Sequence, residues 1–97
     1  MAKFLLVHGG LHGAWCWSKL IPHLETHGHD VLAIDMPGLG DDPTPAEQTT
    51  LSDYGDAVAR GARAMGGDVI AVGHSLGGMS ISTGAEKAPE LFSKLVY

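Results

Sequence analysis

Apolar residues along the chain fall into three short unbroken runs, at residues 4–7, 31–34 and 69–72. Runs of this kind are typical of strands that are buried on both faces of a parallel sheet, whereas a half-exposed strand alternates apolar and polar positions. A further apolar stretch at residues 95–97 has the character of the opening of another strand. The pattern therefore predicts a parallel sheet with three strands and the start of a fourth.

Between the first two runs, apolar residues recur at helical steps over residues 17–24, and Gly28 is placed to end such a helix. Pro22 leaves the start of this helix open, because proline fits only the first turn without losing a backbone hydrogen bond.

Two more helices are expected after the second and third runs. Thr50 and Asp53 have the spacing of an N-terminal cap and precede a helical stripe over residues 51–65. The last helix is expected from Ser75 to about Ala88. Strands alternating with helices predict an α/β fold, a parallel sheet with flanking helices, and residues 35–50 read as a loop over the carboxyl end of that sheet.

Size and charge exclude several classes of protein. A chain of 97 residues, 44% of them apolar, corresponds to one globular domain or part of one. The formal net charge of -5 argues against nucleic-acid and anionic-membrane partners. Cys16 is the only cysteine, and no histidine pair has metal-ligand spacing beside a carboxylate within one predicted element. The apolar run near the N-terminus is too short for a signal peptide or a membrane span. We expect a soluble, cytoplasmic protein without a metal site.

The stretch Gly73-His74-Ser75-Leu76-Gly77 matches the pattern G-x-S-x-G and lies between the third apolar run and the third predicted helix. In that context the serine sits on a sharp strand-to-helix turn, which requires glycines because Cβ atoms there would collide with neighbouring backbone. The turn projects the hydroxyl away from the sheet and places free helix amides beside it. We therefore predict Ser75 as a catalytic nucleophile.

A second short motif, His8-Gly9-Gly10, ends the first apolar run. By itself it is equally consistent with a simple tight turn. Beside a nucleophilic serine, however, a glycine loop can present a backbone N–H to a developing oxyanion. We therefore predict the amides of Gly10 and Leu76 as the two oxyanion donors.

Residues 5–42 and 69–82, with the motif H-G-x-x-H-G-x-W at residues 8–15, resemble the α/β-hydrolase superfamily, in particular the branch of plant methylesterases and hydroxynitrile lyases. This resemblance implies the N-terminal part of an α/β-hydrolase fold. It also implies that Ser75 is the nucleophile, that Gly10 and Leu76 form the oxyanion hole, and that His8 supports the loop after the first strand. No cofactor is implied.

The same resemblance favours one candidate function over two others. Lyase members carry Thr at the position of Gly9, and Glu and Cys at the positions of His74 and Leu76, so the departures favour a serine hydrolase acting on a small carboxylic ester. A hydroxynitrile lyase-type enzyme and a non-catalytic ligand-binding or receptor-like module are the alternatives.

The catalytic base is not found among these residues. In α/β-hydrolases an Asp or Glu and then a His follow the serine, but all six histidines here lie at or before position 74. Glu86 and Glu90 are expected to be solvated, His12 is the earlier histidine best placed to substitute, and His74 is expected to pack or to line the pocket. The other histidines of the first helical region, His23, His27 and His29, are expected at the surface. We expect the acid and base beyond Tyr97 in a complete protein.

Residues 1–97 are accordingly interpreted as a partial α/β-hydrolase domain that lacks the later strands, the cap and the C-terminal part. A hydrophobic sheet with an uncovered edge favours self-association. Near the first glycine motif, Trp15 and Trp17 are expected to pack, and Cys16 is expected to be buried rather than reactive.

Overall fold

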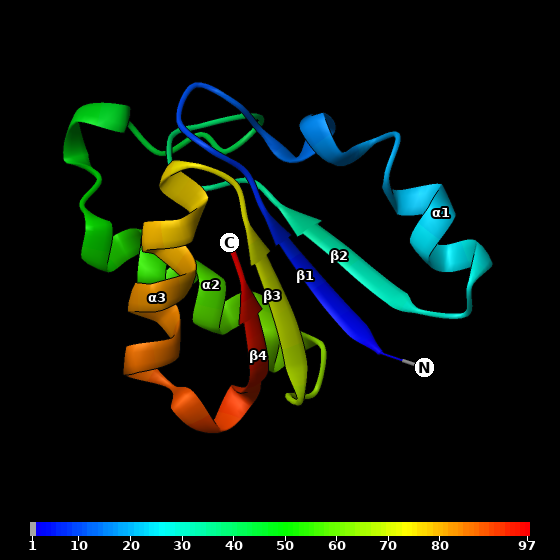
Figure 1. Ribbon diagram of the computed structural model, residues 1–97. Coiled ribbons are helices and arrows are strands. Elements are labelled where there is room, and N and C mark those ends of the chain that lie inside the picture. The colour runs from blue at the N-terminus through cyan, green and yellow to red at the C-terminus, as the bar shows by residue number, and fades with distance from the viewer. Residues whose placement is uncertain (1) are drawn as a thin grey trace.

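The computed structural model describes residues 2–97, whose four strands form one parallel sheet (Figure 1). The strands are β1 (Lys3–Val7), β2 (Asp30–Ile34), β3 (Val69–Gly73) and β4 (Phe92–Val96), and their order across the sheet is β2-β1-β3-β4. The predicted α/β class with a parallel sheet is confirmed. Within residues 2–97, β2 and β4 are the two edges of the sheet, so self-association through an edge stays a prediction.

Three α-helices connect the strands: α1 (Ile21–Thr26), α2 (Leu51–Ala64) and α3 (Leu76–Lys87). From β1 the chain moves toward one edge of the sheet to form β2, and from β2 it moves in the opposite direction to form β3 and then β4. Right-handed connections therefore require α1 on one face of the sheet and α2 with α3 on the opposite face. In agreement, α2 and α3 pack on each other, while α1 lies beside β2 (Figure 1). None of the helices formed by residues 2–97 has the length and apolar character needed to cross a membrane.

Three segments differ from the sequence-based expectation. The first helix begins only at Ile21, so that Pro22 lies in its first turn, and a 3-10 turn, η1 (Ala14–Trp17), precedes it. The loop at 35–50 contains a second 3-10 turn, η2 (Ala46–Gln48). The fourth strand begins at Phe92, after a third 3-10 turn, η3 (Pro89–Leu91).

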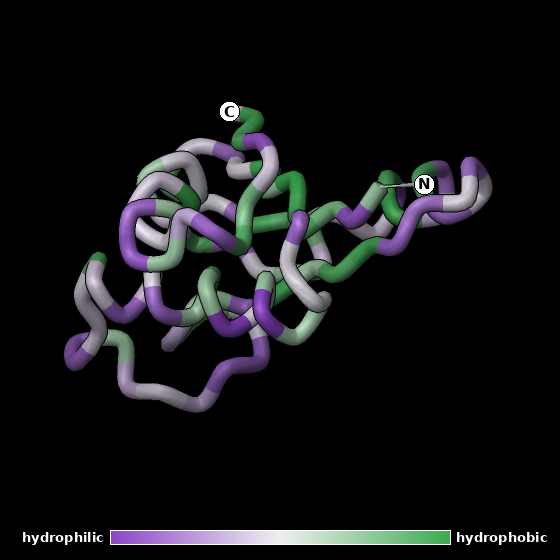
Figure 2. The backbone as a smooth tube through the Cα atoms, turned by 90° about the horizontal axis from the view of Figure 1, so that it is seen from below, coloured by the Kyte–Doolittle hydropathy of each residue, from purple (hydrophilic) through white to green (hydrophobic). Residues whose placement is uncertain are grey.

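The hydrophobic core is centred on β1. Leu5, Leu6 and Val7 have no exposed surface, as expected for a strand with neighbours on both edges and cover on both faces. Val58 of α2 and Ile81 of α3 complete the core on the helix side and are also fully buried. In Figure 2 several hydrophobic stretches of the backbone tube pass through the middle of the molecule, whereas the loop at the lower edge of the view is largely hydrophilic.

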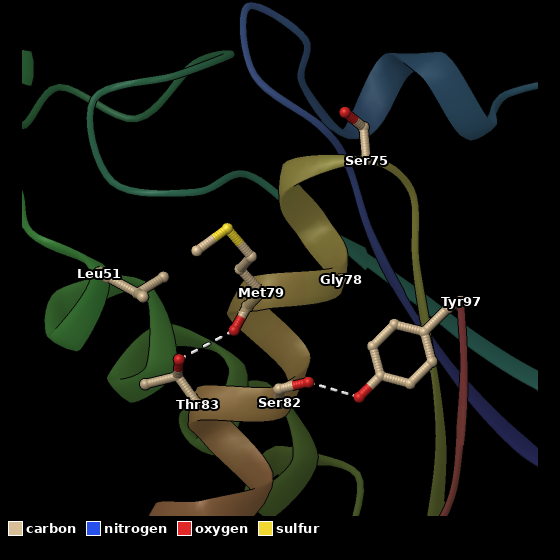
Figure 3. A pocket seen from close by; sticks show the side chains of 7 residues that line it. All are labelled: Leu51, Ser75, Gly78, Met79, Ser82, Thr83 and Tyr97. Carbon is tan, nitrogen blue, oxygen red and sulfur yellow. Dashed lines mark hydrogen bonds between the residues drawn. The ribbon is translucent and has the colours of Figure 1, made fainter.

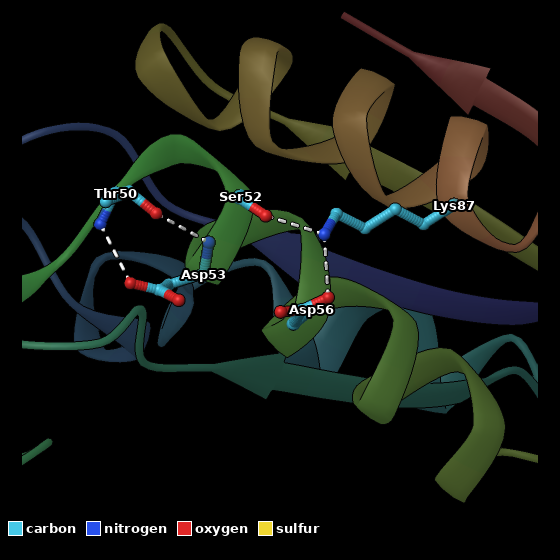
Figure 4. Close-up of polar contacts among 5 residues, drawn as sticks. All are labelled: Thr50, Ser52, Asp53, Asp56 and Lys87. Atoms are coloured by element: carbon cyan, nitrogen blue, oxygen red, sulfur yellow. Dashed lines mark hydrogen bonds and ion pairs between the residues drawn. The ribbon is translucent and has the colours of Figure 1, made fainter.

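The N-terminus of α2 is capped as the sequence predicts. The Thr50 hydroxyl accepts a hydrogen bond from the Asp53 amide at 3.2 Å, and the Asp53 carboxylate accepts one from the Thr50 amide at 3.0 Å (Figure 4). Nearby, the Lys87 ammonium at the end of α3 binds Ser52 and Asp56 of α2 at 2.7 and 2.9 Å. Because this ion pair is exposed to solvent, we attribute the register of α2 against α3 mainly to their apolar contact.

Thr50→Ala is expected to lower the free energy of unfolding by about 1 kcal/mol, because it leaves the Asp53 amide without its acceptor. Thr50→Ser keeps a hydroxyl at the cap and is the matched control. Chemical denaturation of the three proteins measures the difference. Equal stability of the alanine and serine variants would show that the cap contributes nothing measurable.

Candidate active site

The loops that follow β1 and β3 meet at the carboxyl end of the sheet. The chain leaves β1 toward β2 on one side, while β3 pairs with β1 on the other, so the strand order reverses at this point. In open α/β sheets ligands bind in the crevice at such a reversal. The His74 amide donates to the Val7 carbonyl at 3.1 Å and extends the pairing of the two strands into the loops.

Ser75 occupies the turn between β3 and α3 with φ 57° and ψ -120°, and its side chain is exposed. This conformation is one that L-residues adopt at a cost of roughly 1–3 kcal/mol, and strain of this kind is concentrated at functional sites. The following amides of Gly77 and Gly78 donate to the carbonyls of His74 and Ser75 at 2.9 and 2.8 Å. The serine is thus held on a tight, strained turn.

The two glycines of the G-x-S-x-G motif are required by close backbone contacts. A Cβ on Gly73 would lie 2.5 Å from the Gly77 carbonyl oxygen, and one on Gly77 would overlap the carbonyl oxygens of Val7 and His8. The prediction that Cβ atoms at both positions would collide with backbone is confirmed. Helix α3 can therefore approach the end of β1 directly.

The glycine loop after β1 lies against the serine turn. A Cβ on Gly9 would be 3.2 Å from the Cβ of Ser75, and one on Gly10 would be 3.7 Å from the Leu76 side chain. Among the hydrogen bonds formed by residues 2–97, none uses the amide of Gly10 or of Leu76 as its donor. The structure thus brings Ser75, Gly10 and Leu76 together, with both amides lacking an acceptor in the described part of the chain.

His8 connects the glycine loop to the loop after β2. Its side chain is 1% exposed, its Nδ1 is 2.7 Å from the Gly9 carbonyl oxygen, and its Nε2 accepts a hydrogen bond from the Met36 amide at 2.9 Å. The imidazole therefore links the two loops beside the serine turn.

Comparison with known proteins agrees with this arrangement. The sequence model described as "Alpha/beta hydrolase family" matches residues 4–97. The chain belongs to the alpha/beta hydrolase family. Within it the chain is similar to the methylesterases, the branch that its sequence resembles.

The relatives found in these comparisons are longer than this chain. This chain is 40% identical to Methylesterase 1 of Arabidopsis thaliana and 42% identical to Salicylic acid-binding protein 2 of Nicotiana tabacum, in each case over 97% of this chain and 37% of the relative. The crystal structure of a methylesterase from Arabidopsis superposes with a TM-score of 0.89 at 30% identity, covering 100% of this chain and 42% of that one. The chain thus spans less than half the length of these family members.

Asp35, the first residue after β2, organises the loops of this family member, and sequence reasoning did not single it out. Its carboxylate accepts hydrogen bonds from the amides of Ala14 and Asp41, at 2.7 and 3.2 Å. The only sequence signal was its position, directly after a buried strand and within a loop rich in glycine and proline. Asp35 therefore joins the loops after β1 and β2, as His8 also does.

A neighbouring carboxylate serves the same loop internally. Asp42 accepts hydrogen bonds from the Gly38 and Thr44 amides at 3.1 and 2.9 Å. Hydrogen bonding from Thr44, followed by that from the Gly38 amide, holds the pKa of the Asp42 carboxyl below its usual range. Asp42 is thus ionised, and its carboxylate serves to hold the loop in shape.

The histidines near Ser75 do not complete a triad within residues 2–97. His12 bonds the Gly10 carbonyl through Nδ1 at 2.9 Å, and its ring centroid lies 6.1 Å from that of His74. Neither histidine forms a hydrogen bond with the Ser75 hydroxyl among the described residues. His74, which was expected to pack or to line the pocket, is exposed.

Two further expectations concern the segment after the glycine loop. Trp15 was expected to pack, but it is 63% exposed, because the short η1 turn holds it at the surface with one side against His12. Cys16 is partly buried, and burial, which outweighs a backbone hydrogen bond, raises the pKa of its thiol above the ordinary value. The higher pKa agrees with the expected low reactivity of this cysteine.

The other histidines of the first helical region and the two glutamates after Ser75 follow the sequence prediction with one exception. His23, His27, Glu86 and Glu90 are exposed, as expected. His29 instead is half-buried, accepts a hydrogen bond from the Ala2 amide at 3.0 Å and packs edge-on against Phe4. No group of three potential metal ligands is found within residues 2–97.

A hollow of about 410 Å³ runs along the outer side of α3, with Ser75 at one end. Its other walls are Leu51, Gly78, Met79, Ser82, Thr83 and Tyr97 (Figure 3). Three of its side-chain hydroxyl groups are paired, since Thr83 donates to the Met79 carbonyl and Ser82 bonds Tyr97. In Figure 3 the Ser75 hydroxyl points away from Met79 and Ser82.

Proposed function

We propose that residues 1–97 belong to a carboxylic-ester hydrolase in which Ser75 is the nucleophile. The observation that carries this proposal is the strained turn at Ser75, with φ 57° and ψ -120°, directly against a glycine loop whose Gly10 amide has no acceptor within residues 2–97. A protein has no structural need to place an exposed serine in such a conformation, since glycine would adopt it at lower cost. Several relatives carry the name methylesterase, which favours methyl esters of small carboxylic acids as substrates.

The chemistry follows from this placement. The Ser75 hydroxyl oxygen bonds to the ester carbonyl carbon while its proton passes to a general base, and the carbonyl oxygen becomes an oxyanion. The amides of Gly10 and Leu76 donate hydrogen bonds to that oxyanion, each donor being worth about 2.7–4 kcal/mol of transition-state stabilisation. Expulsion of the alcohol leaves an acyl-serine, and water then releases the carboxylic acid. The base, and the carboxylate that orients it, come from outside residues 1–97.

The test is covalent labelling of the complete protein with a fluorophosphonate, which reacts with activated serines. We expect one labelled peptide, the one that contains Ser75, and no label on the Ser75→Ala protein. The Ser82→Ala protein is the matched control, because Ser82 lies on the same helix with its hydroxyl bonded to Tyr97. Labelling at another serine, or no labelling of a folded and complete protein, would contradict the proposal.

A ligand-binding function with little turnover is the second candidate, and the name of one relative, Salicylic acid-binding protein 2, favours it. Turnover separates the two functions. A protein that binds a small carboxylic acid or its ester tightly, and releases no product from the ester, would support binding over catalysis.

A further inference from the structure

Two histidines lie one helical turn apart at the end of α1. His23 is in the last turn of this helix and His27 is its C-terminal cap, and both side chains are exposed. Residues four positions apart on a helix share one face, with their Cβ atoms about 5–6 Å from each other. The turn between the two histidines is closed, since the His27 amide donates to the Leu24 carbonyl at 3.2 Å. Both imidazoles therefore belong to the same face of the helix end.

The hydrogen bond of the His27 ring determines which of its nitrogens can bind a metal ion. Nδ1 lies 2.8 Å from the His23 carbonyl oxygen, which can only accept, so Nδ1 carries a hydrogen. Nε2 of the neutral ring is then the atom with the available lone pair. A histidine that binds a metal ion almost always donates its other N–H to a carbonyl, a carboxylate or water, which fixes the tautomer and the ring orientation. His27 already has this arrangement.

The His23 ring is available as the second ligand. Among the hydrogen bonds formed by residues 2–97, none uses its ring nitrogens, and its side chain is exposed. A metal ion bound at about 2.1 Å from each of two nitrogens brings these nitrogens to about 3 Å from each other, which rotation of two neighbouring exposed side chains can achieve. Glu25 comes two residues after His23 and therefore belongs to another face of the helix.

The other histidines are less suited to bind a metal ion in pairs. The rings of His12 and His74 are 6.1 Å apart between centroids, but their planes meet at 87°, so the edge of one ring faces the other ring. Nδ1 of His29 accepts a hydrogen bond from the Ala2 amide, and the His8 ring is buried with both nitrogens paired. The end of α1 is thus the place where two imidazoles can converge.

We propose that His23 and His27 form a binding site for one divalent transition-metal ion. Imidazole nitrogen suits Cu²⁺, Ni²⁺ and Zn²⁺, whereas Mg²⁺ and Ca²⁺ require oxygen ligands. The affinity of such sites is generally highest for Cu²⁺. The sequence-based expectation of no metal site considered only histidine pairs beside a carboxylate, and two imidazoles bind these ions without one. Water fills the positions that the two histidines leave open.

This site is separate from the proposed ester-hydrolase site. α1 ends shortly before β2 begins at Asp30, so His27 lies near the amino end of a strand, whereas Ser75 follows the carboxyl end of β3. In a parallel sheet these are opposite ends. The metal ion can therefore bind whether or not Ser75 is a nucleophile.

Calorimetric titration of the complete protein with CuCl2 tests the site. We expect saturable binding of Cu²⁺, weaker binding of Ni²⁺ and Zn²⁺, and no binding of Mg²⁺ at the same place. His23→Gln and His27→Gln should each weaken Cu²⁺ binding roughly 100-fold, because two linked ligands bind about 10²–10⁴ times more tightly than one. Glu25→Gln is the matched control, since it removes a negative charge from the same helix but keeps both imidazoles. Its affinity for Cu²⁺ should equal that of the unaltered protein.

Unchanged Cu²⁺ affinity in either histidine variant would overturn the inference, and so would an equal loss in Glu25→Gln. If a variant fails to fold, the unaltered protein gives the answer through NMR, because Cu²⁺ is paramagnetic and broadens the signals of nearby nuclei. A substoichiometric amount should broaden the imidazole signals of His23 and His27 before those of His12 and His74. The reverse order would overturn the inference.

Discussion

Replacement of Ser75 by alanine is expected to reduce ester hydrolysis by the complete protein by roughly 10,000-fold or more, because no acyl-serine can form without the hydroxyl. The backbone at position 75 should keep its strained conformation, since Gly77 and Gly78 remain bonded to the carbonyls of residues 74 and 75. Substrate binding, measured as the dissociation constant of an unreactive amide analogue, should therefore change little.

Two companion variants make this result specific to the nucleophile. Ser82→Ala removes a hydroxyl from the same helix and should leave hydrolysis unchanged. Ser75→Gly should be as inactive as Ser75→Ala but more stable, by about 1 kcal/mol, because glycine adopts φ 57° and ψ -120° without the strain of a Cβ. Wild-type hydrolysis rates in either position-75 variant would exclude Ser75 as the nucleophile.

The arrangement of strands could be predicted to the extent that each strand is a continuous apolar run. β1 has neighbours on both edges and its last three residues are fully buried, so its sequence contains no polar interruption. In β4, Ser93 and Lys94 interrupt the apolar residues, so only its final apolar residues stood out in the sequence. The strand itself was predicted, but its start was missed, because polar residues interrupt the apolar run there.

The candidate site was predictable where a single backbone feature dictates the residue type. The glycines around Ser75 have no alternative, because any Cβ there meets backbone atoms. The contacts of His8 and Asp35 could not be predicted from spacing, because their partners are backbone amides in other loops, and an amide is present whatever the side chain. The same limitation applies to Trp15, whose exposure depends on how the loop after β1 turns.

Gly77→Ala is expected to be among the most destabilising single substitutions in the chain. The added Cβ would overlap the carbonyl oxygens of Val7 and His8, at the end of the central strand of the sheet. Overpacking of this kind typically costs about 1–3 kcal/mol, and we expect the upper end of that range because the obstructing atoms are backbone and not a flexible side chain. Chemical denaturation of the complete protein measures the loss.

Gly10→Ala is the matched control for stability, because its Cβ would make only an ordinary contact, at 3.7 Å, with the Leu76 side chain. A Gly77→Ala protein as stable as the Gly10→Ala protein would show that α3 is free to move away from β1. If instead only Gly77→Ala is destabilised, the close approach of α3 to the end of β1 is rigid. That rigidity holds the Leu76 amide and the Gly9–Gly10 loop in fixed relation, since both are anchored at the end of the same strand.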